Sequence, residues 1–397
     1  MPSSPSRGEF IALLALLFAT IALSIDAMLP ALPDIAQALS PDTPNKAQLV
    51  ITSFVLGMGV GTLFAGPLSD AFGRKATILA GFVLYILAAF ACWAAPSLET
   101  LLIARVVMGI GSAFPRTVSV AMVRDMFKGR EMAQIMSFAM MIFTLVPAVA
   151  PLMGQGVIAL AGWQAIFVAY ILFALIVMGW FALRQPETLP REDRRPLALG
   201  ALARASVEVM GHRVVLISIA AQALTLGMLF AALSSIEGIF SQLFGRADSF
   251  ALWFALIAMA SMSGSILNAR LVMRLGMRRM VSATYIVLLV ATLGYLAVAL
   301  LVTPGSGFAL HILWMIILFA AMGLTLGNLN ALAMEPLGHI AGLAASVTSA
   351  IATVVSVILA VPVGLMFNGT QVPLLIGVAV YATGAVALTK MLASRDG

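Results

Sequence analysis

Apolar stretches of about 20 residues alternate with short polar turns along almost the whole chain. A helix needs roughly 20 apolar residues to cross a bilayer, whereas the strands of a membrane barrel show alternating segments of about ten. The pattern therefore predicts an all-α membrane protein with twelve transmembrane helices. The predicted spans are 10–32, 49–68, 76–95, 98–123, 132–160, 163–183, 214–236, 250–272, 280–302, 308–334, 340–366 and 373–392.

The turns between these spans indicate a duplication. Residues 66–75 join the second and third spans, and residues 268–279 join the eighth and ninth. Gly276 lies 203 residues after Gly73, while Met273 stands where the first turn has Asp70. This spacing favours two pseudo-symmetric six-helix bundles, in residues 1–183 and 214–397, with a cytoplasmic connector at 184–213. A chance likeness between two basic turns is the alternative.

Composition and charge narrow the class of protein. The chain is 62% hydrophobic and 10% charged, whereas soluble domains have about 25% charged residues. If both termini are cytoplasmic, 18 of the 22 Lys and Arg residues, from Arg7 to Arg395, lie in cytoplasmic loops, and only Lys46 and Arg246 lie outside. This bias predicts that orientation. The same loops explain the net charge of +6, so no nucleic-acid partner is expected.

Two charged residues lie inside predicted spans at matching depth. Asp26 is in the outer half of the first span, and Arg105 is about seven residues from the outer end of the fourth. A charge inside the bilayer is costly, so both are expected to face a cavity or a partner. We predict that Asp26 and Arg105 meet in at least one conformation. Burial and a nearby cation change the proton affinity of a carboxylate in opposite directions, so such a pair suits proton coupling. A static pair that only registers two helices is the alternative.

The fourth span carries a second arginine, Arg116, on the same helical face as Arg105, about 16 Å along the axis. No acid matches its depth, so Arg116 is a candidate substrate contact; snorkelling toward water is the alternative. Three amides and one aromatic complete the predicted cavity, although interhelical hydrogen bonds and core packing could equally account for them. These residues are Gln222, Asn328, Asn330 and Phe143. Glu237 and His311 lie near outer span ends and are expected at the membrane interface.

The fifth span contains Pro147, Pro151 and Gly154. Two prolines at i and i+4 followed by glycine remove amide donors and bulk from one face. We expect a bend or a close helix contact there.

These residues resemble the major facilitator superfamily over essentially the whole chain. The turn Gly66-x-x-x-Asp70-x-x-Gly73-Arg74-Lys75 resembles its signature loop between spans two and three. Arg105 with Gly109, and Asp26 with Pro30, resemble motifs of its twelve-span drug:proton antiporters. The stretches 24–33, 123–126, 136–138, 150–154, 162–167 and 187–190 resemble the bicyclomycin/chloramphenicol-resistance (Bcr/CflA) exporters.

The resemblance implies export driven by proton influx across a bacterial inner membrane, with Asp26 as the coupling acid and Arg105 as its partner. It also implies a conformational latch on the cytoplasmic side. The latch residues are Gly66, Asp70, Gly73, Arg74 and Asp125. Spans one, four, seven and ten would line the central site. No cofactor or metal is implied, since the proton gradient supplies the energy, and a monomer is expected.

The sequence departs from the antiporter pattern in the fifth span. Val146, Ala150 and Gln155 stand where the family pattern has glycine, which weakens the implied direction of transport. The implied bend is carried by Pro147, Pro151 and Gly154.

Three functions are therefore compared. The leading hypothesis is a proton-coupled exporter of small amphiphilic molecules, acting by alternating access in the lipid bilayer. An importer or facilitator of one metabolite is the first rival, and a membrane sensor or scaffold that transports nothing is the second. An enzyme is not expected, because the sequence has no nucleophile–base set, phosphate loop or His/Cys cluster with metal spacing.

Overall fold

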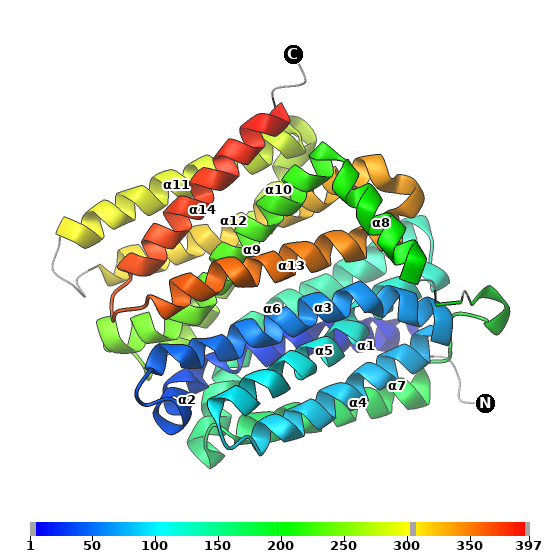
Figure 1. Cartoon of the computed structure of the whole chain (residues 1–397), viewed down its shortest axis with the longest axis horizontal. Coiled ribbons are helices and arrows are strands. Elements are labelled where there is room, and N and C mark those ends of the chain that lie inside the picture. The colour runs from blue at the N-terminus through cyan, green and yellow to red at the C-terminus, as the bar shows by residue number, and fades with distance from the viewer. Residues whose placement is uncertain (1–4, 195, 198, 302–306, 394–397) are drawn as a thin grey trace. The chain divides into compact units, whose positions relative to one another are not determined.

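A computed structural model of the chain describes residues 5–194, 196–197, 199–301 and 307–393, and these are almost entirely helical with no strands (Figure 1). Val302, the predicted end of the ninth span, and Arg395, one of the predicted cytoplasmic cations, lie outside the described residues. Eleven helical stretches of the described chain are long and apolar enough to cross a membrane. One of them, Phe308–Leu365, has 58 residues and contains two long helices separated at Leu337 by non-helical backbone angles. Counted separately, these two helices bring the number of spans to the predicted twelve.

The long helices of the first half agree with the predicted spans within a few residues. They are α1 (Arg7–Asp26), α3 (Leu49–Phe72), α4 (Arg74–Trp93), α5 (Leu98–Met126), α6 (Gly129–Ala161) and α7 (Ala165–Arg184). The first span differs most, because its α-helix ends at Asp26 rather than near residue 32. The 3-10 turn η1 (Leu29–Ala31), the short α2 (Leu32–Leu39) and the 3-10 turn η2 (Pro44–Gln48) follow. Pro30 and Pro33 explain the break, since proline has no amide hydrogen to continue the ladder.

The second half has the same number of long helices. They are α9 (Arg213–Gly238), α10 (Phe250–Leu275), α11 (Met277–Leu301), α12 (Phe308–Met334), α13 (Ala341–Leu365) and α14 (Val372–Ala393). Shorter pieces connect them: η3 (Arg191–Asp193) and α8 (Leu199–Gly211) before α9, the π-helical η4 (Ile239–Leu243), and η5 (Glu335–Ile340). In each half the third and sixth long helices pack together, as α4 does with α7 and α11 with α14 (Figure 1).

The chain forms two compact units. The first comprises Met1–Ile35 with Ser53–Ala205, and the second comprises Ala36–Thr52 with Ser206–Gly397. The division therefore falls inside the predicted connector 184–213 and assigns one early segment to the later unit. A side-chain contact explains this assignment. The Asn45 amide donates to the backbone carbonyls of Leu365 and Phe367, at 3.1 and 2.6 Å.

The predicted duplication is visible in matching polar contacts. The Ser24 hydroxyl lies 2.6 Å from the Tyr85 hydroxyl, and the Thr225 hydroxyl lies 2.5 Å from that of Tyr285. Thr225 follows Ser24 by 201 residues, and Tyr285 follows Tyr85 by 200. The two basic turns also share one backbone conformation, with φ/ψ of 99°/156° at Gly73 and 78°/155° at Gly276.

Close helix packing in the first unit positions α5. A Cβ added to Gly57 of α3 would collide with the carbonyl of Val106, and one added to Gly109 of α5 would collide with the carbonyl of Phe54. Small residues of this kind let membrane helices approach at backbone distance. The inward side chains of α5 consequently lie directly against α1 and α3.

Candidate functional site

The end of α1 leaves one backbone carbonyl without its helical partner. In a continued α-helix the Met28 amide would donate to Ser24, but here it donates to Ile25 at 3.3 Å. Two side chains from other helices take its place at the Ser24 carbonyl. Arg105 Nη2 donates at 3.0 Å, and the Tyr170 hydroxyl at 3.3 Å. The helix break and the buried arginine are thus parts of one arrangement.

Arg105 is completely buried. Besides the Ser24 carbonyl, its guanidinium contacts the sulfur of Met108 at 3.6 Å and lies 4.5 Å from the centre of the Phe54 ring. Within the described residues no ion pair joins Arg105 to Asp26. In this conformation the Arg105 guanidinium therefore donates to a backbone carbonyl. Its contact with Asp26 in another conformation stays a prediction.

Asp26 is the last residue of α1 and is 5% exposed. No hydrogen bond or ion pair of its carboxylate is found in the part of the chain that the structure describes. A buried carboxylate in this setting is costly unless a proton or another partner joins it. Asp26 therefore stays the predicted proton-binding group of the first unit.

Hydroxyl groups of α1 and α4 contact one another close in sequence to Asp26. The Ser24 hydroxyl donates to the Thr20 carbonyl at 2.6 Å. Because a serine hydroxyl has one hydrogen, the Tyr85 hydroxyl must be the donor in its 2.6 Å contact with Ser24. Neither Tyr85 nor Tyr170 was predicted from the sequence. Their position in the middle of apolar spans, in a chain with five tyrosines, was the available signal.

Helix α6 contacts the chain directly after Asp26. A Cβ on Gly154 would collide with the carbonyl of Ala27, so the expected close contact is present at this glycine. The helix continues through Pro147 and Pro151 as one element. Phe143, one turn before the prolines, packs edge-on against Phe18 with ring centres 6.3 Å apart.

Arg116 differs from Arg105 although both were placed on one face of the helix. Arg116 is an exposed residue, whereas Arg105, Gly109, Ser112 and Ser119 are buried. Its guanidinium has no hydrogen bond or ion pair among the described residues. The two arginines therefore differ in environment: Arg105 is buried inside the bundle, whereas Arg116 is an exposed residue, and its contact with substrate stays a prediction.

The remaining predicted cavity residues belong to the second unit. Gln222 on α9 is buried, and its side-chain nitrogen has no partner within the described residues. Asn328 on α12 donates to Asn268 of α10 at 2.7 Å, which is the interhelical hydrogen bond considered as the alternative. Asn330 is exposed.

Two residues near predicted outer span ends are buried by other parts of the protein. Glu237 is 6% exposed and His311 is fully buried, and their position at the membrane interface stays a prediction. His311 packs among aromatic rings and lies 3.3 Å from the hydroxyl of Tyr295 through Nδ1. Its neighbouring rings include Phe240, Phe244 and Trp314. Hydropathy locates the end of a span but not the side of the helix that turns inward.

The predicted latch residues meet at the start of α4. The Arg74 side chain is 9% exposed and donates from Nη1 to Asp70 and from Nε to Asp125 at 2.9 Å. Nη1 also contacts the Ser69 hydroxyl at 2.7 Å. Asp70, Arg74 and Asp125 therefore form one charge cluster built from α3, α4 and α5.

Glu187, which was given no role from the sequence, completes this cluster. Its carboxylate accepts from the backbone amides of Arg74 at 2.9 Å and Lys75 at 3.1 Å, and it pairs with Arg194 at 3.7 Å. The first amides of a helix lack internal partners, and Gly73 has no side chain to cap them. That uncapped start was the signal for an acid from elsewhere in the chain.

Comparison with known proteins agrees with this architecture. The family model of the Major Facilitator Superfamily matches residues 14–361. The uncharacterised MFS-type transporter YdgK of Bacillus subtilis is 30% identical over 97% of this chain and 95% of its own length. A bicyclomycin resistance protein homolog of Haemophilus influenzae is 28% identical over 100% and 99%. A chloramphenicol resistance protein of Pseudomonas aeruginosa is 34% identical over 42% of this chain and 40% of its own.

Solved structures extend the likeness to the fold. A D-xylose–proton symporter superposes with a TM-score of 0.76 at 15% identity, covering 96% of this chain and 95% of that one. The human organic anion transporter MFSD10 superposes with a TM-score of 0.68 at 18% identity, covering 98% and 100%.

Proposed function

Because this chain belongs to the Major Facilitator Superfamily, we propose that it is a proton-coupled exporter of small amphiphilic molecules. It works by alternating access in a bacterial inner membrane, with both termini in the cytoplasm. It is a transporter and not an enzyme, it needs no cofactor, and it acts as a monomer. The proton gradient supplies the energy.

The buried carboxylate of Asp26 is the observation that carries this proposal. It lies where α1 breaks, and it has no protein partner among the described residues. A proton arriving at Asp26 neutralises a charge inside the apolar bundle, and its departure restores that charge. Proton binding therefore changes the free energy of this conformation directly.

Arg105 supplies the alternative partner. Its guanidinium is held by the Ser24 carbonyl, two residues before Asp26 on the same helix. A shift of Arg105 from this carbonyl to the carboxylate would favour loss of the proton, since a nearby cation stabilises the charged acid. Movement at the end of α1 is thus linked to the protonation of Asp26.

Arg116 offers the substrate a polar contact. Arg116 is an exposed residue, and its guanidinium has no hydrogen bond or ion pair among the described residues. Phe143, in the same unit, offers an aromatic surface. Apolar surface with few polar groups suits amphiphilic molecules. Relatives whose names carry bicyclomycin, chloramphenicol and multidrug resistance support a drug-like substrate.

Import of one metabolite is the second candidate, because the fifth span lacks three glycines of the antiporter pattern. Direction distinguishes the two. An importer would accumulate one polar compound and would leave drug tolerance unchanged.

The test uses proteoliposomes and cells that lack their own exporters, with chloramphenicol and bicyclomycin as probes. Wild type should move a probe against its gradient when a pH gradient is imposed, and Asp26→Asn should reduce this movement at least about tenfold. Asp34→Asn, which removes an exposed acid in α2, is the matched control and should transport normally. Unchanged coupled transport by Asp26→Asn would refute Asp26 as the coupling acid.

A further inference from the structure

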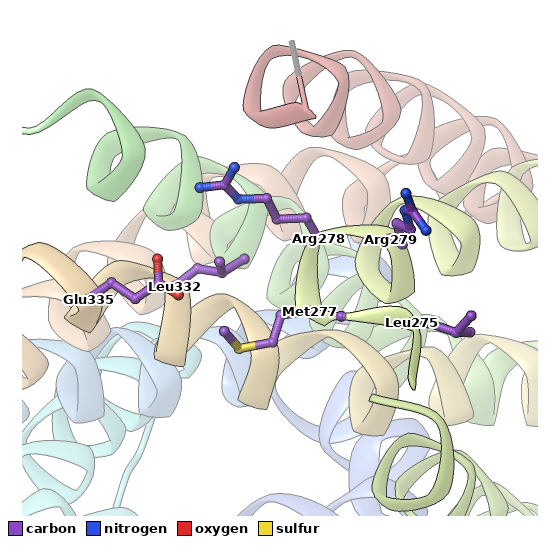
Figure 2. Close-up of a pocket in the computed structure, with 7 residues that line it drawn as sticks. Leu275, Met277, Arg278, Arg279, Leu332 and Glu335 are labelled. Carbon is purple, nitrogen blue, oxygen red and sulfur yellow. The ribbon is translucent and has the colours of Figure 1, made fainter. Parts of the chain in front are cut away.

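A pocket of about 390 Å³ lies in the second unit at the start of α11 (Figure 2). It combines two arginines and one acid with apolar side chains. Its lining residues are Leu275, Gly276, Met277, Arg278, Arg279, Leu332 and Glu335. In Figure 2, Arg278 extends toward the side where Leu332 and Glu335 lie, and Arg279 lies on the other side of the first turn of α11.

The equivalent turn in the first half of the chain is occupied by a carboxylate of the same protein. Gly73 and Gly276 have the same backbone conformation, and a basic helix start follows each of them. At α4 the carboxylate of Glu187 accepts from two backbone amides. A Cβ on Gly73 would lie 2.5 Å from that carboxylate, whereas nothing among the described residues lies within 4 Å of one on Gly276. The first turn is thus filled by an anionic group, and the second leaves space.

The charges near the second turn are mostly positive. Arg270 and Arg274 on the last turns of α10 add to Arg278 and Arg279, and Glu335 is the one acid among the described residues that line the pocket. Met273, where the first turn has Asp70, is 90% exposed and brings no negative charge. The pocket therefore favours an anion.

We propose that this pocket binds the phosphate of an anionic phospholipid headgroup. The positive charges of Arg278 and Arg279, which line the pocket from two sides of the first turn of α11, attract the phosphate, while Leu275, Met277 and Leu332 pack against the apolar part of the same molecule. The mixture of arginine and leucine favours a lipid over free phosphate, because free phosphate has no use for the apolar lining. Basic pockets at the cytoplasmic ends of transmembrane helices suit acidic headgroups in this way. This site is separate from Asp26 and does not depend on the direction of transport.

The test measures thermal unfolding of the full chain in neutral detergent with added phosphatidylglycerol, phosphatidylcholine or inorganic phosphate. Phosphatidylglycerol should raise the midpoint in a saturable manner, while the other two should have little effect. The variant R278Q/R279Q should bind phosphatidylglycerol about 30-fold more weakly, as expected for the loss of two arginines near an acidic headgroup. The variant R278K/R279K should retain most of the binding and thereby exclude a folding defect.

The matched control is R124Q/R130Q, which removes two exposed cations that flank the turn between α5 and α6. It should bind phosphatidylglycerol as wild type does. Equal loss in this control would overturn the proposal in favour of general charge attraction. An equal midpoint shift with inorganic phosphate would overturn the lipid as the ligand, and saturable binding unchanged in R278Q/R279Q would place the site elsewhere.

Discussion

The two halves of this protein share a backbone plan but differ in charge. Both have a hydroxyl–tyrosine contact between their first and third long helices, at Tyr85 and Tyr285. Only the first has a buried carboxylate in this place: Asp26 follows Ser24 by two residues, whereas Gly227 follows Thr225. The duplicated fold therefore tolerates the loss of the acid.

The two basic turns repeat this difference. Arg74 bridges Asp70 and Asp125, and Glu187 caps the helix start. The second turn keeps its glycine and its arginines, but Met273 replaces the acid. Backbone geometry has thus been retained in both halves, while the charge cluster belongs to one.

The largest difference is expected between Arg74→Met and Arg278→Met. Loss of Arg74 leaves the Asp70 and Asp125 side chains, which are 44% and 21% exposed, without their shared cation, so the free energy of unfolding should fall by about 2 kcal/mol. Arg278 is only half-buried, so its loss should cost less than about 1 kcal/mol in neutral detergent. Titration with sodium dodecyl sulfate measures both. Equal losses of stability in the two variants would contradict a stabilising role of the Asp70, Arg74 and Asp125 cluster.

A smaller difference is expected between the two turn glycines. Both have a backbone conformation that is essentially restricted to glycine, so Gly276→Ala should destabilise the protein by about 2 kcal/mol. Gly73→Ala should cost about 1 kcal/mol more, because its methyl group would also displace the Glu187 carboxylate from its amides. The same unfolding titration compares the two. A larger loss in the free energy of unfolding for Gly276→Ala than for Gly73→Ala would contradict this difference in packing.

The smallest effect is expected where the halves agree. Tyr85→Phe and Tyr285→Phe each remove one buried hydroxyl group from an equivalent contact, so each should lower the free energy of unfolding by about 1 kcal/mol. Their difference should be close to zero. A clear gap between them in thermal or detergent unfolding would contradict the equivalence of the two contacts.

The sequence was sufficient for the fold because apolar runs of bilayer length report directly on spanning helices. It also brought Asp70, Arg74 and Asp125 together through the family motif. It did not indicate which way a polar residue faces, and the burial of His311 and Glu237 was therefore not predicted. Glu187 was missed because its partners are backbone amides, which have no side-chain pattern.

The contacts of Arg105 could not be predicted from the sequence for a related reason. Its oxygen partner is a carbonyl released by a local break in α1. Pro30 signals the break, but the choice of receiving side chain depends on the packing of α5 and α7. Helical spacing likewise placed Arg105 and Arg116 together, although only one is buried.

The contacts of Asn45 have a consequence for biosynthesis. Its carbonyl partners on Leu365 and Phe367 lie 320 and 322 residues further along the chain. At a synthesis rate of about 5–20 residues per second, Asn45 waits roughly 15–65 seconds for them. The first loop therefore completes its native contacts only when nearly the whole protein has been translated.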